Sequence, residues 1–280
     1  MEKIGAIIQA RISSARLPGK ILKELPYRSG ITVLEQVVNR LKKSKKLNDI
    51  IIATTTEKID DEITTIAKKE EVKFFKGSKE NVLSRYYLTA KENNIDLIVR
   101  VTSDCPCIDA DVLDLAIGDH INKVADYTSN ALVRTYPHGL DVEVFNFNTL
   151  EKAYKNATKD YEKEHVTPYI NRNPQKFKIN IVKAPKELYA PDIRITLDTE
   201  EDYALLCAVF DYLYPQNKYF NAYDIVNLFN EKPWLKLINK KIMQKKIFNT
   251  LEEELEEAKK ILGLQDLNRA RDFVGEYLSK

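Results

Sequence analysis

The chain has 280 residues, of which 44% are hydrophobic and 31% are charged, and its formal net charge is +2. This composition is typical of a folded globular protein, and the even mixing of charges argues against a dedicated nucleic-acid binder. Three cysteines and three histidines argue against a disulfide framework and against a Cys/His metal site. We expect a cytoplasmic protein, because the cysteine usage favours a reducing setting and neither a signal peptide nor a membrane-spanning run is evident.

The first half of the chain alternates short apolar runs with helical patterns. The apolar runs predict buried strands at Ile4–Gln9, Ile50–Thr54, Lys73–Phe75 and Leu97–Val101. Apolar residues at helical spacing predict helices at Gly30–Lys43, Asp60–Glu70, Asn81–Asn93 and Asp109–Asn122. This alternation predicts an α/β fold with a mainly parallel, twisted sheet and helices on both faces.

The pattern changes after about residue 125. Short strand-like runs follow at Asp126–Tyr127, Leu140–Phe145, Phe177–Ile181 and Ile193–Leu197, and a helix is expected at Glu200–Tyr212. We expect an insertion at about 126–190 to supply antiparallel strands and the acceptor side of a site. The main α/β domain is predicted at 1–220, and the charged segment 221–280 is predicted to be a helical C-terminal extension with a break at Gly263.

The segment from Gln9 to Lys20 has the features of a phosphate-binding loop. It leaves the first predicted strand at its carboxyl end, where open α/β sheets bind ligands. Its cations and hydroxyls are Arg11, Arg16, Lys20, Ser13 and Ser14. Guanidinium groups bind phosphate oxygens in a fixed fork, an ammonium group is a mobile point charge, and successive backbone amides form anion-binding nests. The alternative is a solvated basic loop, and neither a Walker A nor a dinucleotide fingerprint is present.

Two aspartates lie at the ends of predicted strands. Asp104 comes just after Leu97–Val101, and Asp198 ends Ile193–Leu197. Two carboxylates at the same sheet edge could share Mg²⁺, which prefers a few carboxylates together with water and phosphate oxygens. The alternative for each aspartate is a turn or a helix cap.

A further group of polar residues surrounds the segment 136–143. Asp141 and Glu143 are two residues apart and would share one face of a strand. The candidate acceptor-binding residues are Asn130, Tyr136, His138, Asp141, Glu143 and His165. Because no Ser-His-Asp or Cys-His arrangement is evident, we expect direct attack by the acceptor, assisted by alignment and charge stabilisation.

Taken together, these motifs resemble a known family. The segment IIQARISSARLPGKIL is similar to the signature of the cytidylyltransferases that include CMP-sialic acid and CMP-Kdo synthetases, and above all to their spore coat polysaccharide biosynthesis protein F branch. The resemblance covers roughly residues 3 to 210 and continues through IIATTTEKIDDEI, FFKGSKENVLSRYYLTAKE, RVTSDCPCIDADVLD, YPHGLDVEVF, KEHVTPYI and ITLDTEEDY. Ser13 and Ala15 depart from the Gly and Thr that are common in the family loop.

The resemblance implies a nucleotide-diphospho-sugar transferase-like fold, CTP as substrate and Mg²⁺ as cofactor. It assigns Asp104 and Asp198 to the metal, and it implies catalytic roles for Lys20, Arg16 and Asp104. The nucleotide-binding positions that it implies are Gln9, Ala10, Arg11, Ser13, Ser14, Arg16, Lys20, Thr54, Thr55, Gly77, Arg85 and Ser103.

We therefore predict a cytidylyltransferase that transfers CMP from CTP to a sugar acceptor, for example an ulosonic acid, and releases pyrophosphate in polysaccharide or glycan biosynthesis. One alternative is a nucleotidyltransferase acting on a sugar phosphate, which product mass would distinguish. Another is a non-catalytic nucleotide-binding subunit, which would bind CTP without turnover. A glycosyltransferase is disfavoured because no D-x-D motif follows the fourth strand. We expect no nucleic-acid or membrane partner, and a homodimer is a candidate assembly.

Overall fold

The computed structural model describes residues 2–242 and 250–279. The chain divides into two compact units, Met1–Lys240 and Lys241–Lys280. Within the described ranges, no helix has the length and apolar character that crossing a membrane requires.

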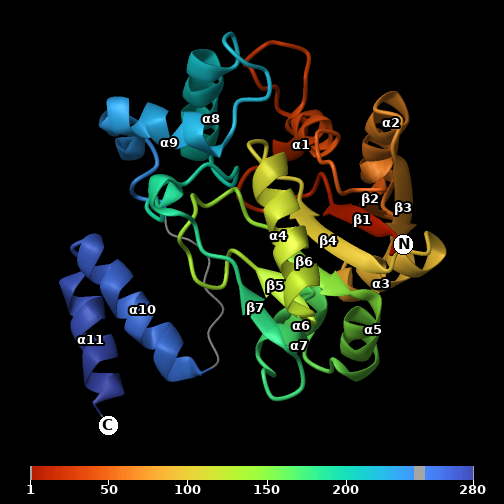
Figure 1. Ribbon diagram of the computed structural model, residues 1–280. Coiled ribbons are helices and arrows are strands. Elements are labelled where there is room, and N and C mark those ends of the chain that lie inside the picture. The colour runs from red at the N-terminus through yellow and green to blue at the C-terminus, as the bar shows by residue number, and fades with distance from the viewer. Residues whose placement is uncertain (1, 243–249, 280) are drawn as a thin grey trace. The chain divides into compact units, whose positions relative to one another are not determined.

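A seven-stranded sheet forms the centre of the first unit (Figure 1). Its strands are β1 (Ile4–Gln9), β2 (Asp49–Thr55), β3 (Lys73–Gly77), β4 (Leu97–Thr102), β5 (Tyr127–Ser129), β6 (Glu143–Asn146) and β7 (Ile179–Ile181). Their order across the sheet is β3-β2-β1-β4-β6-β5-β7. The first four are mutually parallel, β6 runs antiparallel to both β4 and β5, and β7 is parallel to β5. The predicted mainly parallel sheet is confirmed.

Helices cover both faces of this sheet (Figure 1). Those of the first unit are α1 (Val33–Leu41), α2 (Asp61–Lys69), α3 (Val82–Glu92), α4 (Ala110–Lys123), α5 (Phe147–Asn156), α6 (Asp160–His165), α7 (Pro168–Asn171), α8 (Glu200–Leu213) and α9 (Ala222–Glu231). Neighbouring residues of β1 enter different apolar clusters, Ile7 one and Ile8 the other, because successive side chains of a strand point to opposite faces.

Local sequence explains where several helices begin. The Thr32 hydroxyl accepts a hydrogen bond from the Glu35 backbone N–H, and the Glu35 carboxylate accepts one from the Thr32 N–H. This capping box satisfies two free amides and starts α1 at Val33 rather than at the predicted Gly30. Thr199 forms the same arrangement with Asp202 at the start of α8.

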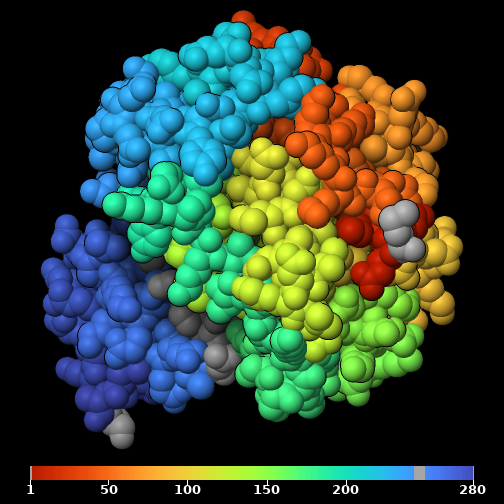
Figure 2. All heavy atoms as spheres, in the orientation of Figure 1, coloured from red at the N-terminus to blue at the C-terminus, as the bar shows by residue number. Residues whose placement is uncertain are grey.

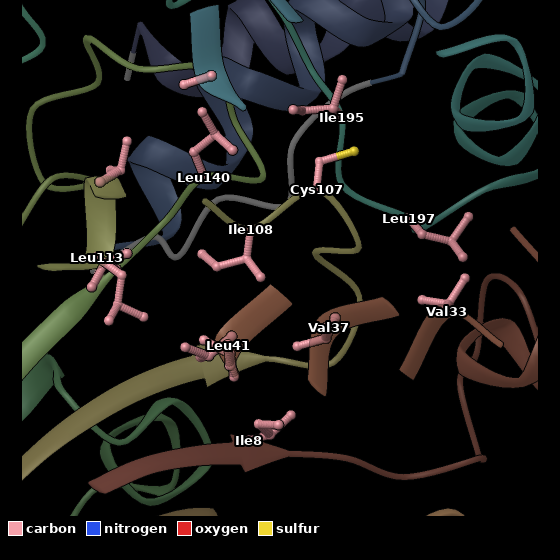
Figure 3. Close-up of a cluster of buried hydrophobic side chains, with 14 of the residues drawn as sticks. Ile8, Val33, Val37, Leu41, Cys107, Ile108, Leu113, Leu140, Ile195 and Leu197 are labelled. Carbon is pink, nitrogen blue, oxygen red and sulfur yellow. The ribbon is translucent and has the colours of Figure 1, made fainter. Parts of the chain in front are cut away.

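The larger apolar cluster joins segments from most of the first unit. Figure 3 shows Ile8 of β1, three side chains of α1, and residues from the segments after β4 and before α8 converging on one core. The labelled residues of that view are Ile8, Val33, Val37, Leu41, Cys107, Ile108, Leu113, Leu140, Ile195 and Leu197. This core holds the loops that follow β1 and β4 in fixed positions.

Two predicted strands differ from the structure. Ile193–Leu197 is extended but makes only one isolated bridge, between Arg194 and His138. Its amides are satisfied by loops instead of a ladder, because Ile195 N donates to His138 O and Leu197 N donates to Asp104 O, both at 2.8 Å. The run predicted at Leu140–Phe145 enters the sheet only at Glu143, in β6.

The first unit extends past the predicted boundary at residue 220 and ends at Lys240. Helix α9 buries Ile225 and Phe229 in the larger core, so it is part of this unit and not of an extension. Arg40 of α1 also reaches this region, where its Nη1 donates to Phe220 O at 2.7 Å. Figure 2 shows cyan atoms from this part of the chain bordering red-orange atoms of the first fifty residues.

The second unit contains a helical hairpin. Helices α10 (Leu251–Leu264) and α11 (Asn268–Leu278) pack against each other and are joined by three residues. Gly263 lies in the last turn of α10, just before the connection, rather than at the break itself.

Candidate active site

The carboxyl ends of β1 and β4 lie where the strand order reverses. From β1 the chain continues to β2 and β3 on one side, and it then returns to place β4 on the other side. Open α/β sheets bind ligands in the crevice outside such a switch point. Two segments leave the sheet there, residues 10–19 after β1 and residues 103–106 after β4. They carry the predicted phosphate ligands and one predicted metal ligand.

The loop after β1 is closed by its own backbone and by Asp60. Ile12 N donates to Asp60 Oδ1 at 2.7 Å, and Gly19 N donates to Ile12 O at 3.1 Å. Gly19 has a φ of 67°, a conformation that favours glycine and that returns the chain toward Lys20. Asp60 also accepts a hydrogen bond from the Thr55 hydroxyl. Asp60 is not among the residues predicted from the sequence, because there it is only an acidic residue at a helix start.

Lys20 lies between the two aspartates that were predicted as metal ligands. Its ammonium nitrogen is 2.5 Å from Asp104 Oδ2 and 2.9 Å from Asp198 Oδ1. Burial alone would lower the pKa of Lys20, but the two carboxylates outweigh burial and raise it. Burial alone would raise the pKa of Asp198, but Lys20, Arg194 and Arg16 lower it to about 2. The charged residues from three distant parts of the sequence thus form one cluster.

Arg194 completes this cluster from the side of α8. Its Nη2 is 2.9 Å from Asp198 Oδ2, and its Nε and Nη2 donate to Asp202 at 2.9 and 2.8 Å. Asp202 is buried and also accepts from the backbone amides of Asp198 and Thr199. Asp202 therefore fixes both Arg194 and the backbone that carries Asp198. Neither residue was a sequence candidate, because only the fold brings them to the sheet edge.

The segment after β5 reaches the same cluster through Arg194. Arg194 Nη1 is 3.1 Å from His138 Nδ1, and His138 Nε2 is 3.7 Å from Asp141 Oδ2. Asp141 in turn forms a bidentate ion pair with Arg134, with N–O distances of 2.7 and 3.0 Å. Burial lowers the pKa of His138 and favours the neutral imidazole. The structure thus links two predicted acceptor-binding residues to Asp198: His138 through Arg194, and Asp141 through His138 and Arg194.

Three other predicted acceptor-binding residues are buried, and the hydroxyl of one of them, Tyr136, has no hydrogen-bond partner among the described residues. Asn130 is buried, and its amide is bonded to the backbone of Leu140 and Val142. Tyr136 is only 1% exposed. Glu143 accepts hydrogen bonds from three side chains of the protein. Little of the surface of these three side chains is accessible in this structure, and their contact with an acceptor stays a prediction.

The predicted nucleotide-binding residues differ in their exposure to solvent. The exposed or half-buried ones lie on the loop after β1 and at the adjoining strand end, at Gln9, Arg11, Ser13, Ser14 and Arg16. Thr54 and Thr55 are fully buried in β2. The Thr55 hydroxyl donates to Asp60, whereas the Thr54 hydroxyl has no hydrogen-bond partner among the described residues. Contact of these two side chains with a nucleotide stays a prediction.

The remaining predicted positions have structural partners. Buried Arg85 donates from Nη1 to Ser78 O at 2.7 Å and so holds the loop after β3. A Cβ at Gly77 would lie 3.2 Å from the Arg85 side chain. Ala10 and Ser103 join the switch-point strands through their backbones, to Ala53 O and Gln9 O. His165 is the last residue of α6.

Comparison with known proteins assigns a family. The family model for cytidylyltransferases matches residues 5–261. An uncharacterised protein of Methanocaldococcus jannaschii is 40% identical over 248 residues, which cover 87% of this chain and 97% of that protein. The spore coat polysaccharide biosynthesis protein SpsF of Bacillus subtilis is 33% identical over 238 residues, which cover 83% of this chain and 96% of that protein.

A solved structure extends the similarity to three dimensions. A cytidylyltransferase from Leptospira borgpetersenii serovar Hardjo-bovis matches with a TM-score of 0.78 and 36% sequence identity, covering 89% of this chain and 100% of that chain. The range matched by the family model, residues 5–261, includes both switch-point segments and the residues Lys20, Asp104 and Asp198. The chain belongs to the cytidylyltransferase family.

Proposed function

We propose that this protein transfers CMP from CTP to a sugar acceptor and releases pyrophosphate. The observation that carries the proposal is the cluster of Lys20, Asp104 and Asp198 beside a cationic loop at the switch point. Family membership supports nucleotidyl transfer from a cytidine triphosphate. The similarity to SpsF, a spore coat polysaccharide biosynthesis protein, supports a sugar-type acceptor, and ulosonic acids are the first acceptors to test.

The chemistry needs alignment and charge stabilisation more than a covalent intermediate. The acceptor hydroxyl loses its proton to solvent and its oxygen forms a bond to the α-phosphorus, while the bond from that phosphorus to the pyrophosphate oxygen breaks. Arg16 and Lys20, which pair with Asp198 and Asp104 in this structure, would neutralise the charge that develops on the departing phosphates. Rigid anchoring of the loop through Asp60 keeps these cations aligned before the substrate binds.

The same cluster fits a Mg²⁺ ion. Oxygens of Asp104 and Asp198 converge on one point, which the Lys20 ammonium occupies as a cation. Within residues 2–242 and 250–279, no group of three or more His, Cys, Asp or Glu side chains is arranged to hold a metal. Mg²⁺ is usually held by one or two carboxylates together with water and substrate phosphates, so two aspartates suffice once a triphosphate is bound. When bound there, Mg²⁺ would supply charge neutralisation at the phosphates.

Pyrophosphate release tests the proposal directly. The protein would be mixed with Mg²⁺, each nucleoside triphosphate in turn, and a panel of acidic and amino sugars. We expect release with CTP and one acceptor, and a loss of about a hundredfold in kcat for Asp104→Asn. Asp111→Asn, which removes an exposed carboxylate at the start of α4, is the matched control and should keep full activity.

The other outcomes separate the alternatives. A product that retains a phosphate from the acceptor, seen by mass, would identify a sugar phosphate as the acceptor. CTP binding without release from any acceptor of the panel would favour a binding subunit. No interaction with any triphosphate would contradict the phosphate loop and the proposed function with it.

A further inference from the structure

A buried chain of hydrogen bonds ends at Gln9, at the switch point. Arg100 of β4 lies directly across from Glu143 of β6, and its Nη1 donates to Glu143 Oε2. Arg100 Nη2 donates to Gln9 Oε1 at 3.0 Å. On the other side, Glu143 Oε1 accepts from the hydroxyls of Tyr127 and of Thr167, the latter at 2.8 Å. Side chains from β1, β4, β5, β6 and the start of α7 are thus joined in one relay.

The relay is largely shielded from solvent. The side chains of Arg100 and Glu143 are 15% and 12% exposed. A buried ion pair contributes little stability over an apolar pair of the same volume, and it holds its geometry only when further hydrogen bonds satisfy both partners. Glu143 has these further bonds through Tyr127 and Thr167. Stability alone therefore does not account for the pair, whereas a role in orienting Gln9 does.

The relay determines which end of the Gln9 amide faces the site. A guanidinium group has donors and no acceptor, so Arg100 can bond only to Oε1 of Gln9. The amide nitrogen Nε2 must then point the other way. Among the described residues, Nε2 donates to no protein atom. It is also absent from the buried polar atoms that lack a partner, so this nitrogen is accessible. Gln9 thus presents a free donor beside Thr102, its register partner across the switch point.

We propose that Gln9 Nε2 donates a hydrogen bond to an oxygen of the nucleoside part of bound CTP, and that Arg100 and Glu143 are positioning residues that set the direction of this donor. The inference rests on the proposed function. A neutral amide suits a neutral oxygen, such as a ribose hydroxyl or the pyrimidine carbonyl, while the cations further along the loop suit the phosphates. On its other side, Gln9 pairs with Ala53 of β2. The predicted nucleotide-binding residues Gly77 and Arg85 lie in that direction, because β3, which ends at Gly77, pairs with β2.

Calorimetric titration with CTP tests the role of Gln9. Gln9→Met keeps the length of the side chain and removes both amide atoms, and we expect about fivefold weaker CTP binding, the effect of one neutral hydrogen bond. Gln9→Glu should bind still more weakly, because its carboxylate can accept from Arg100 but cannot donate and adds negative charge. Gln175→Met, at an exposed position after α7, is the matched control and should bind CTP like the wild type.

A double-mutant cycle tests the positioning residues. Glu143→Gln should weaken CTP binding about threefold in the wild-type background and should add nothing in the Gln9→Met background, because both changes act through the same donor. A merely structural role of Glu143 would give additive losses. Thr167→Val removes one hydrogen bond from Glu143 and serves as a milder variant if Glu143→Gln does not fold.

The results separate this inference from the proposed function. CTP binding by the wild type, with unchanged binding by Gln9→Met, would overturn the inference and leave the proposed function standing. Additive losses in the cycle would overturn the positioning role of Glu143. An absence of CTP binding by the wild type would overturn the proposed function and the inference together.

Discussion

Asp202 accepts two hydrogen bonds from the guanidinium group of Arg194, at 2.9 Å from Nε and 2.8 Å from Nη2. Asp202 is the capping-box residue of α8, and Arg194 also contacts Asp198 at 2.9 Å. One buried carboxylate therefore serves both the start of a helix and the geometry of a candidate metal ligand. Disturbing it should affect stability and activity together.

Asp202→Asn should destabilise the first unit by about 3 kcal/mol, because it leaves Arg194 without its buried counter-charge. In the folded fraction, kcat should fall about tenfold as Asp198 loses its fixed orientation. Urea unfolding and pyrophosphate release would measure the two effects. Glu201→Gln, at the exposed neighbouring position, is the control and should change neither. A folded Asp202→Asn protein with wild-type kcat would contradict the link between Asp202 and Asp198.

Gly139→Ala should destabilise the protein by about 2 kcal/mol. Gly139 has a φ of 117°, and an added Cβ would lie 2.7 Å from Ile195 O, a backbone atom that cannot move aside easily. The backbone movement that relieves this contact should also separate His138 from Arg194. The matched control is Gly118→Ala in α4, where the added Cβ meets only the Lys46 side chain at 3.7 Å and should stabilise the helix by about 0.5–1 kcal/mol. Equal effects of the two substitutions in thermal unfolding would contradict this prediction.

Stability should fall as the pH drops below about 6.5. Burial lowers the pKa of His120, whose Nδ1 is 2.9 Å from Thr128 Oγ1. Between the folded and the unfolded pKa, the unfolded chain binds a proton that the folded protein does not. The stability that neutral His120 contributes is therefore present above the unfolded pKa and is lost as the pH falls below it. Urea unfolding between pH 8 and pH 5, in steps of about one unit, would measure the slope. His120→Gln should reduce the slope in part, because His138, whose pKa burial also lowers, remains. An unchanged slope would show that His120 does not contribute.

Truncation should distinguish the observed boundary of the first unit from the predicted one. Removal of residues 241–280 should leave a cooperative thermal transition, because the first unit has its own core. Removal of residues 221–280 should abolish it, because α9 buries Ile225 and Phe229, and loss of one such aromatic side chain alone costs about 3–5 kcal/mol. Circular dichroism during heating would report both transitions. A folded 1–220 fragment would restore the boundary predicted from the sequence.

The sequence by itself determined the elements of the parallel half, and it pointed to the sheet edge where the candidate site lies. The strand expected at Ile4–Gln9 is β1 with the same bounds, and that expected at Leu97–Val101 differs from β4 by one residue. Apolar runs and helical stripes are local features, so neighbouring residues suffice to predict them. The rule that ligands bind at the carboxyl ends of parallel strands then pointed to the loops holding Lys20 and Asp104.

Only the tertiary structure decided which polar groups meet. Lys20 and Asp198 are 178 residues apart in the sequence, and their contact at 2.9 Å depends on the packing of the loop before α8 against the sheet edge. The anchoring roles of Asp60, Arg100 and Asp202 have no local signature, because a charged residue in a strand or a helix start looks the same whether it faces solvent or a buried partner. Long-range packing fixes the partner of each charge, and with it the direction in which the site presents its donors.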